Sequence, residues 1–247
     1  MRCLLGIEDA GNYQIWIGEN QQKFSLPDWK GFVGVFGCHA SMSIGSQGNS
    51  TDFSSFEFQN GDILFQDLDC GGLCDAIETV TEGVDGKSFS HLGLVHIYGD
   101  SIVVIEAIGK AVQVTPLDVF VNRNVDETGN PKIVVTRLSE DNSKLIKNAT
   151  DFAVSQLGVP YDDAFLYDNG SYYCSELIYD AFKSANGDKP FFKLFPMTFK
   201  DPATREMFPV WVEYYENLKL AIPEGKLGCN PGGISRSDKL EVVASFY

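Results

Sequence analysis

Hydrophobic and polar positions divide this chain into two parts. Residues 1–60 are rich in glycine, serine, asparagine and glutamine and have weak periodicity, so we expect a leader or peripheral segment there. From Gly61 onward, apolar runs of strand length alternate with segments of helical periodicity. The predicted domains are therefore 1–60 and a compact domain, 61–247.

Apolar runs in the compact domain predict strands. Residues 61–65 follow a turn at Asn60, and the runs 92–98 and 102–107 are separated only by Gly99-Asp100. A two-residue connection of this kind closes an antiparallel hairpin. Further extended segments are expected at 112–120, 133–135 and 240–246.

Three segments have apolar positions at helical spacing. They are 73–80, 143–157 and a segment that begins between Ser171 and Cys174 and ends near Ala185. Gly158 and Pro160 should end the second of these helices. In the third, Cys174 precedes Leu177 and Ile178 by three and four positions, which puts it on the inward face.

The predicted hairpin brings a histidine and a glutamate together. If Tyr98 pairs with Ser101, then Gly93 pairs with Glu106, and His91 lies on the same face as Glu106 and diagonal to it. The small Gly93 should leave room for both side chains. A three-residue turn would shift this register and separate the two groups.

Cys174, His91 and Glu106 together indicate a thiol enzyme. A helix N-terminus and a nearby imidazole can lower a thiol pKa from about 8.5 to somewhere near 3.5–7.5. The thiolate would attack a carbonyl carbon, His91 would protonate the leaving group, and Glu106 would orient the imidazole. Backbone N–H groups at the helix start would stabilise the oxyanion.

A purely structural interpretation stands beside this one. A lone cysteine in a helix usually packs as a small hydrophobe, and a lone histidine near a turn is usually solvated. A carboxylate in an apolar strand is harder to explain, because burial without a partner is costly. The three residues on one predicted surface favour a functional role.

Composition excludes some classes of function. Nineteen lysines and arginines against 34 aspartates and glutamates give a net charge of -15, which repels nucleic acids and anionic lipid surfaces. No apolar run is long enough to cross a membrane, so we predict no transmembrane helix. Acidity also suits a substrate with free amino groups, although solubility alone can explain it.

The remaining cysteines raise two questions. Residues 30–38 resemble a short signal core that ends at a lipobox-like cysteine, so a lipid anchor at Cys38 is one alternative, although the core is short and thirty residues precede it. Cys70 and Cys74, in Cys-Gly-Gly-Leu-Cys, could form a disulfide or bind a metal. A zinc site needs four ligands, and there is no second cysteine pair. We therefore favour a buried or locally bridged pair.

Five short motifs then support a family resemblance. They are Gly61-Asp62-Ile63-Leu64-Phe65-Gln66, Phe89-Ser90-His91-Leu92-Gly93-Leu94-Val95, Glu106-Ala107, Gly158-Val159-Pro160-Tyr161-Asp162 and Tyr173-Cys174-Ser175-Glu176-Leu177. In this order they resemble the YiiX-like, circularly permuted NlpC/P60 papain-like cysteine peptidases. The resemblance covers about residues 60–185. Residues 222–232 also look like a loop that completes the substrate cleft in bacterial relatives.

The resemblance implies both a fold and a set of site residues. It implies an α+β, circularly permuted papain-like (NlpC/P60) fold, with an antiparallel sheet or small barrel packed against helices. Cys174 is then the nucleophile, His91 the base and Glu106 the orienting residue. Ser90, Tyr161 and Tyr173, which lie within the motifs, are expected to bind substrate, with no cofactor and no metal.

The substrate stays open between related chemistries. We expect an amidase or endopeptidase that cleaves small or cell-wall-type peptides, in a bacterial envelope or periplasm. Acyl transfer or lipid hydrolysis of the lecithin:retinol acyltransferase-like type is the alternative, and a non-catalytic binding domain is a third. An acyltransferase should have an apolar groove or a membrane anchor, and the sequence offers only an aromatic patch, Phe191, Phe192, Phe195 and Phe199.

Overall fold

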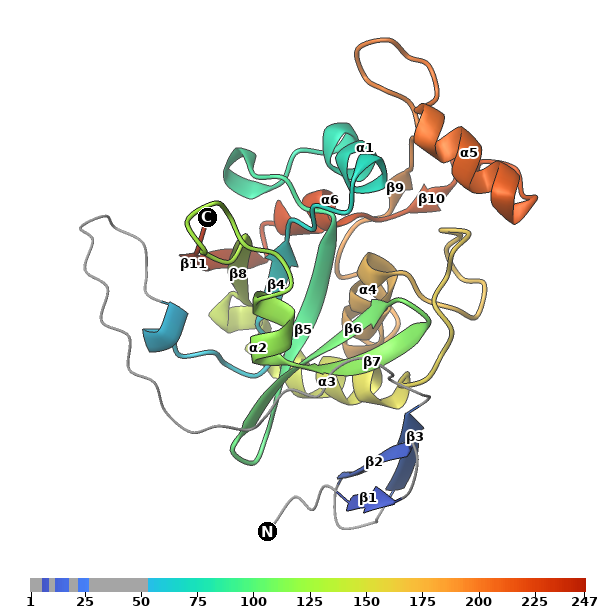
Figure 1. Cartoon of the computed structure of the whole chain (residues 1–247). Helices are drawn as coiled ribbons and strands as arrows, with labels where there is room; N and C mark the ends of the chain where they lie inside the picture. Colours follow the sequence, from blue (N-terminus) through green and yellow to red (C-terminus); the bar gives the residue numbers. More distant parts are fainter. Residues whose placement is uncertain (1–5, 9–11, 18–21, 27–52) are drawn as a thin grey trace. The chain divides into compact units, whose positions relative to one another are not determined.

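The computed structural model describes the backbone of residues 6–8, 12–17 and 22–26 and the chain from 53 to 247 (Figure 1). Contacts divide the chain into two compact units, Met1–Gln47 and Gly48–Tyr247. Each unit is described by itself. None of the helices in the described ranges is long and apolar enough to cross a membrane.

The first unit contains a small antiparallel sheet. Its strands are β1 (Gly6–Glu8), β2 (Asn12–Ile17) and β3 (Gln22–Leu26), in the order β1-β2-β3. No strand is predicted here from the sequence, because these segments are short and their alternation of polar and apolar residues is weak. The split after Gln47 differs from the predicted boundary at residue 60, and the leader role of 1–60 stays a prediction.

The second unit is built on a six-stranded antiparallel sheet. Its order is β11-β8-β4-β5-β6-β7. The strands are β4 (Ile63–Gln66), β5 (His91–Tyr98), β6 (Ser101–Ile108), β7 (Ala111–Pro116), β8 (Ile133–Leu138) and β11 (Leu240–Ser245). The sheet is open, with β11 and β7 at its two edges, and helices pack against it (Figure 1).

Helices fill the connections between these strands. They are α1 (Gly72–Val80), α2 (Leu117–Val121), α3 (Ile146–Ser155), α4 (Cys174–Ala185), α5 (Pro209–Leu218) and α6 (Pro231–Ser235). Short 3-10 helices lie at η1 (Phe53–Ser55), η2 (Val84–Gly86) and η3 (Glu140–Leu145), and β9 (Phe195–Pro196) pairs with β10 (Leu227–Gly228). The α+β prediction is confirmed.

The β5–β6 hairpin has the predicted register. Tyr98 pairs with Ser101 and Leu94 with Ile105, so the connection is the two-residue turn at Gly99-Asp100. Gly99 has a φ of 59°, a conformation that glycine adopts without steric cost. Continuing the register by one position puts Gly93 opposite Glu106.

Two predicted elements differ from the structure. The run 112–120 is not one strand, because β7 ends at Pro116 and α2 begins at Leu117. Pro116 has no N–H to continue the sheet, and its ψ of 141° is still extended, so the helix begins only at the next residue. The predicted helix 143–157 is shorter, since η3 ends at Leu145 and α3 begins at Ile146.

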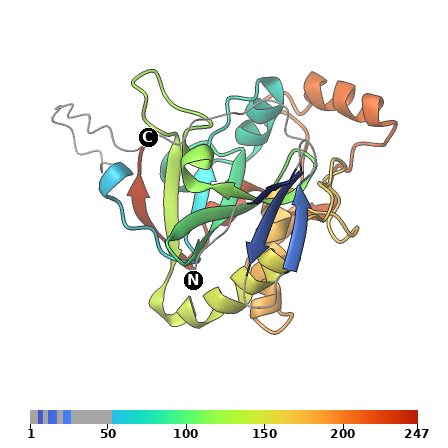
Figure 2. The ribbon, with the colours of Figure 1, turned by 60° about the horizontal axis from the view of Figure 1, so that its bottom comes forward.

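Alternate residues of the sheet serve two cores. On one side, Phe65, Leu92 and Ile105 pack against α3 and α4. On the other side, Leu64, Val95 and Val104 pack with residues of α2 and of the aromatic segment around η1. Figure 2 shows α3 and α4 on one side of the sheet.

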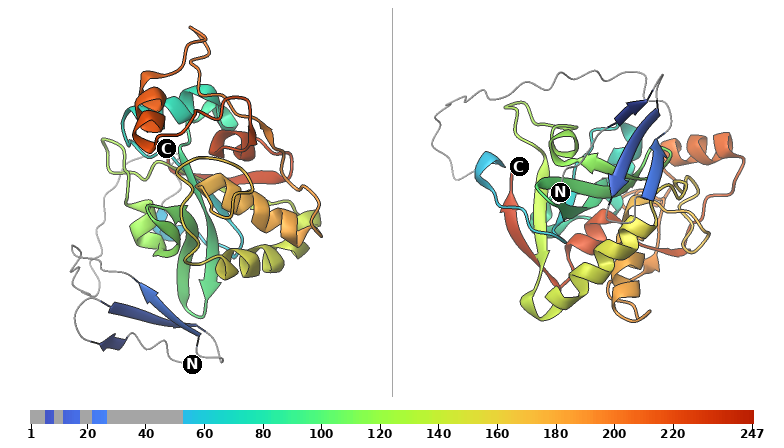
Figure 3. Two further views of the ribbon diagram at one scale, coloured as in Figure 1. Left: turned by 90° about the vertical axis from the view of Figure 1, so that its right-hand side faces the viewer. Right: turned by 90° about the horizontal axis from the view of Figure 1, so that it is seen from below.

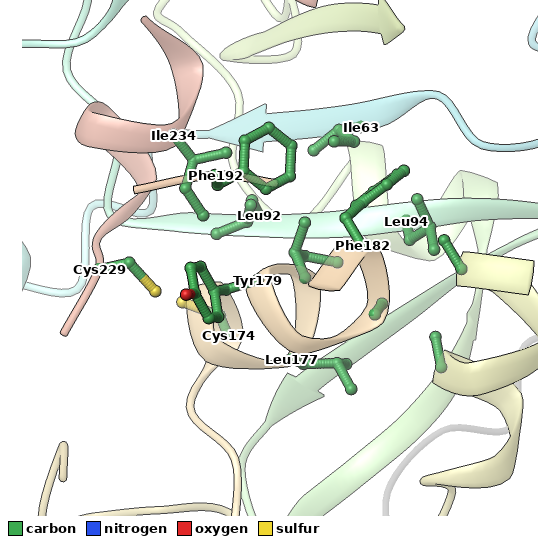
Figure 4. Close-up of a cluster of buried hydrophobic side chains, with 14 of the residues drawn as sticks. Ile63, Leu92, Leu94, Cys174, Leu177, Tyr179, Phe182, Phe192, Cys229 and Ile234 are labelled. Carbon is green, nitrogen blue, oxygen red and sulfur yellow. The ribbon is translucent and has the colours of Figure 1, made fainter. Parts of the chain in front are cut away.

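Helix α4 begins at Cys174 because Tyr173 is still extended. Tyr173 has φ -89° and ψ 169°, and its carbonyl accepts the N–H of Leu177. Farther along, Leu177, Ile178 and Phe182 are buried between α3 and the sheet. Figure 4 shows this inward face, with Cys174 at the first turn.

The C-terminal elements add a third core at one end of the unit. α1 packs against α5 (Figure 3, left), and the buried residues between them include Ala76, Phe199, Trp211 and Tyr215. The chain then passes through β10 and α6 before it returns to the sheet as β11.

A substitution at Gly93 would show how tightly the hairpin is packed. A Cβ atom at this position would lie 2.4 Å from Val104 Cγ1 and 3.1 Å from Phe120 Cε2, so the predicted space is filled by these two residues. Gly93→Ala should lower the free energy of unfolding by about 1–3 kcal/mol, measured by urea denaturation. Gly72→Ala is the control, because its Cβ would meet only ordinary contacts of 3.8 Å. Equal stability of the two variants would contradict the prediction.

Candidate active site

Cys174 lies at the start of α4 and faces a cavity. Its side chain is 6% exposed, and it lines a cavity of about 460 Å³ together with His91. The first N–H groups of a helix have no partners within the helix, so they are available to an oxygen atom placed beside the sulfur. The sulfur therefore combines a helix N-terminus with access to a cavity.

His91 is the first residue of β5 and contacts Glu106 directly. Its Nε2 lies 2.6 Å from Glu106 Oε2, and both side chains are buried. Cys174 lines the same cavity as His91 and is close enough to act on the charge of the imidazole. Because Nε2 is held by the carboxylate, Nδ1 is the nitrogen left for the sulfur. The structure therefore brings the three predicted residues together in the order sulfur, imidazole, carboxylate.

Glu106 is fully buried and has two further partners. Arg123 donates from Nη1 to Oε2 at 2.9 Å and from Nη2 to Oε1 at 2.6 Å. The hydroxyl of Thr115 also donates to Oε1. Neither partner was predicted from the sequence, because neither belongs to a motif and only the register of β6 and β7 and the end of α2 bring them to Glu106.

These contacts shift the two ionisation equilibria in opposite directions. Burial opposes the charged form of His91, but its interactions with Cys174 and Glu106 outweigh this and raise the pKa of His91 to about 9. Burial also opposes ionisation of Glu106, but His91 and Arg123 lower its pKa to about 2. At neutral pH the pair is therefore a carboxylate and an imidazolium.

The three predicted substrate-binding residues line the same cavity as Cys174. The oxygen of Ser90 accepts the N–H of Leu68 at 2.8 Å, and the oxygen of Tyr173 accepts the N–H of Cys229 at 3.1 Å. Burial raises the pKa of Tyr161 well above its usual value, so its hydroxyl stays a neutral donor.

Most of the cavity wall is apolar. It includes Leu73, Ile77, Phe165, Phe195, Phe199 and Trp211. The aromatic patch noted in the sequence thus divides, since Phe195 and Phe199 line the cavity whereas Phe191 and Phe192 are buried in the main core. The periodicity of the sequence indicated a helix at 73–80, but it did not indicate that this helix, α5 and the loops around them form one cavity wall.

Two other sequence features lie at the cavity. Cys70 and Cys74 form a disulfide, and both line the cavity, so the locally bridged pair is confirmed. From the late segment 222–232, the residues Cys229, Asn230 and Pro231 also line it. The oxygen of Asn230 accepts the N–H of Gly233 and caps α6. Cys38 lies outside the described residues.

Comparison with known families assigns the chain. The sequence profile described as "Permuted papain-like amidase enzyme, YaeF/YiiX, C92 family" matches residues 57–244. The chain belongs to the YaeF/YiiX family. The permuted papain-like fold is thereby confirmed, while membership of the wider NlpC/P60 group stays a prediction.

Relatives of this YaeF/YiiX protein include a protein named uncharacterized protein YiiX from Escherichia coli strain K12. The two are 32% identical over 134 residues, which is 52% of this chain and 59% of the relative. The aligned part thus spans about three fifths of that relative's length. A crystal structure of YiiX from Escherichia coli O157:H7 has a TM-score of 0.59 and 26% identity, and covers 76% of this chain and 97% of the other.

The YiiX protein of that crystal structure is described as a metalloprotein. In the part of the present chain that the structure describes, no group of three or more histidine, cysteine, aspartate or glutamate residues could hold a metal ion. Cys174 and His91 could provide two metal ligands. The carboxylate of Glu106 is not available as a third, because His91 and Arg123 hold it. The described residues do not fit a metal site.

Glu176 is a buried carboxyl group next to the site. It is 1% exposed, Oε1 accepts the N–H of Asp168 at 2.8 Å, and Oε2 has no hydrogen-bond partner. Burial raises the pKa of Glu176 to about 8. The hydrogen bond that Oε1 accepts ties the loop before α4 to the first turn of that helix.

Glu176→Gln should therefore stabilise the protein at high pH. A folded-state pKa raised above the usual 4.5 means that the wild type loses stability as the pH rises from 4.5 through 8. We expect the variant to gain about 1–3 kcal/mol over the wild type at pH 8 and little at pH 4, measured by chemical denaturation. Glu213→Gln, at an exposed position on α5, is the control. A difference in the free energy of unfolding between Glu176→Gln and the wild type that does not change with pH would contradict the raised pKa of Glu176.

Proposed function

We propose that the chain is a cysteine amidase that uses Cys174 as nucleophile, His91 as acid and base, and Glu106 as orienting residue. The observation that carries this is the placement of the sulfur at a helix N-terminus, in one cavity with an imidazole that a buried carboxylate holds. The family description as a permuted papain-like amidase supports the same class of reaction.

The proposed reaction has two halves. The sulfur attacks the carbonyl carbon, and the oxyanion receives hydrogen bonds from N–H groups at the start of α4. His91 gives its proton to the leaving nitrogen, the C–N bond breaks, and a thioester on Cys174 remains. His91 then takes a proton from water, the hydroxide attacks the thioester, the C–S bond breaks, and the acid is released with Cys174 again a thiolate beside the protonated His91.

Tyr161 is the best placed of the proposed substrate-binding residues. It lines the cavity beside Cys174 and keeps its proton, so it can donate a hydrogen bond to the substrate or to the oxyanion. Ser90 and Tyr173 already accept backbone N–H groups, and the Tyr173 hydroxyl also lies 3.8 Å from Cys229 Sγ, so Ser90 is the one of the two whose hydroxyl proton we expect to reach a substrate.

The cavity favours a substrate with an apolar acyl portion. Most of its wall residues are apolar, and each buried methylene of a ligand contributes about 0.8 kcal/mol. The net charge of -15 favours an amine-bearing portion on the other side of the scissile bond. Small peptides, including cell-wall-type peptides, meet both conditions when the acyl side is apolar.

Acyl transfer or lipid hydrolysis is the second candidate function. The lack of an apolar groove in the sequence weighed against it, and the apolar cavity removes that objection. The same thioester would then be resolved by an amine or a hydroxyl acceptor instead of water. A lipid anchor at Cys38 and a place in the bacterial envelope belong with either candidate as proposals.

Alkylation tests the site without a known substrate. At pH 7, iodoacetamide should label Cys174 much faster than Cys229, because Cys229 is fully buried and burial raises the pKa of its thiol. His91→Ala should slow the labelling of Cys174 by about tenfold or more, measured by mass spectrometry of peptides. His96→Ala, which changes the other histidine of β5, should leave the rate unchanged. Equal labelling of both cysteines would count against a thiol enzyme.

Turnover distinguishes the two candidate functions. The assay compares three kinds of substrate: peptidoglycan fragments, N-acyl amides of increasing chain length, and lipid acyl donors. Each is tested with and without an amine acceptor, and Cys174→Ala is the control. For the amidase we expect hydrolysis of amides, with kcat/KM rising about fourfold per buried methylene. Acyl transfer from lipids without amide turnover would favour the second candidate. Turnover retained by Cys174→Ala would contradict a thiol mechanism, and no turnover by the wild type with any of these compounds would favour the binding domain.

A further inference from the structure

Glu106 is held more strongly than a histidine-orienting group requires. Its side chain is fully buried, and its two oxygens receive hydrogen bonds from His91, Thr115 and both terminal nitrogens of Arg123. A neutral group would suffice to fix the orientation of an imidazole. The orientation of His91 therefore does not explain why a second cation, Arg123, also binds Glu106.

The charges of His91, Glu106 and Arg123 explain the presence of Arg123. A buried carboxylate beside an imidazolium, with no other counter-charge, would hold the proton of His91 strongly. A general acid must release its proton to the leaving group, so excessive stabilisation of the imidazolium slows this step. A bidentate arginine takes up part of the carboxylate's charge.

The guanidinium of Arg123 is itself fixed in place. Its central carbon lies 5.1 Å from the centre of the Phe120 ring, and that ring lies 5.8 Å from the ring of His91. Gln66 donates a hydrogen bond of 2.9 Å to the carbonyl oxygen of Phe120 and so ties α2 to β4. Arg123 thus reaches Glu106 from a short helix that packs on the sheet.

We propose that Arg123 is a positioning residue that acts on His91 through Glu106. It shares the carboxylate, so that Glu106 orients the imidazole without binding its proton too tightly for transfer. The groups that face His91 are Glu106 on β6 and Cys174 on α4, with Tyr161 in the same cavity and Arg123 behind Glu106. The catalytic consequence rests on the proposed function, whereas the charge balance does not.

The experiment follows the titration of His91 by NMR in protein labelled at histidine. The signal is assigned with His91→Ala. In Arg123→Gln the midpoint should rise by about one unit or more, because the carboxylate then faces the imidazolium alone. Arg123→Lys keeps the charge and should bring the midpoint back to within about half a unit of the wild type. An unchanged or lowered midpoint in Arg123→Gln overturns the proposal.

Arg137→Gln is the matched control. Arg137 makes a similar two-point ion pair with Asp62, whose side chain is also fully buried. Asp62 lies four positions before Gln66, which pairs with His91, so the control pair is roughly 13 Å away along β4. The control should lower stability and leave the midpoint of His91 in place. An equal shift in Arg137→Gln would show that the effect is not specific to Arg123.

A double variant covers the case in which Arg123→Gln does not fold. Removing Arg123 alone leaves a buried charge without its partner, whereas Glu106→Gln/Arg123→Gln removes both charges. If Arg123 acts through Glu106, the midpoint of His91 in the double variant lies within about half a unit of that in Glu106→Gln. A difference of about one unit or more between these two overturns the proposal.

Activity provides a separate readout. With any substrate that the wild type hydrolyses, Arg123→Gln should lower kcat by about tenfold and change KM little, because the effect lies in proton transfer. A variant with normal kcat and a shifted titration would overturn the catalytic part. Absence of turnover by the wild type would instead contradict the proposed function, and the titration would still test the charge balance.

Discussion

The buried carboxylate of Glu106 is the constraint around which this site is organised. A charge removed from water is tolerated only when its lone pairs are satisfied and its charge is compensated. Both conditions are met here by groups from separate elements, with His91 from β5, Thr115 from β7 and Arg123 from the end of α2. The sheet register and the short helix are thus fixed to one another by the same group that orients the imidazole.

Helix α4 completes the site from the other side of the sheet. Its inward residues pack with Leu92 and Ile105, which alternate with His91 and Glu106 along the two strands. His91 and Glu106 face the opposite side, toward Phe120, but His91 is the first residue of β5 and Cys174 the first of α4, so both reach the same cavity at the edge of the packed layers.

The site combines polar chemistry with an apolar surround. Elements far apart in the sequence build the cavity, since the Cys70–Cys74 disulfide lies at the start of α1 and α5 contributes Trp211. An apolar wall excludes water and strengthens the electrostatic interactions inside. Under the proposed function, the same wall would favour apolar groups in a substrate, so amide hydrolysis and acyl transfer are both candidate reactions.

The hairpin, the helix that begins at Cys174 and the meeting of His91 with Glu106 could all be predicted from the order of the residues, because a two-residue turn and an alternating strand leave little freedom in register. The end of β7 at Pro116, the partners Arg123 and Thr115, and the apolar cavity could not. Local periodicity decides which residues share a strand or helix face. Which elements then pack together depends on contacts between residues far apart in the chain, and these contacts become visible only in the folded molecule.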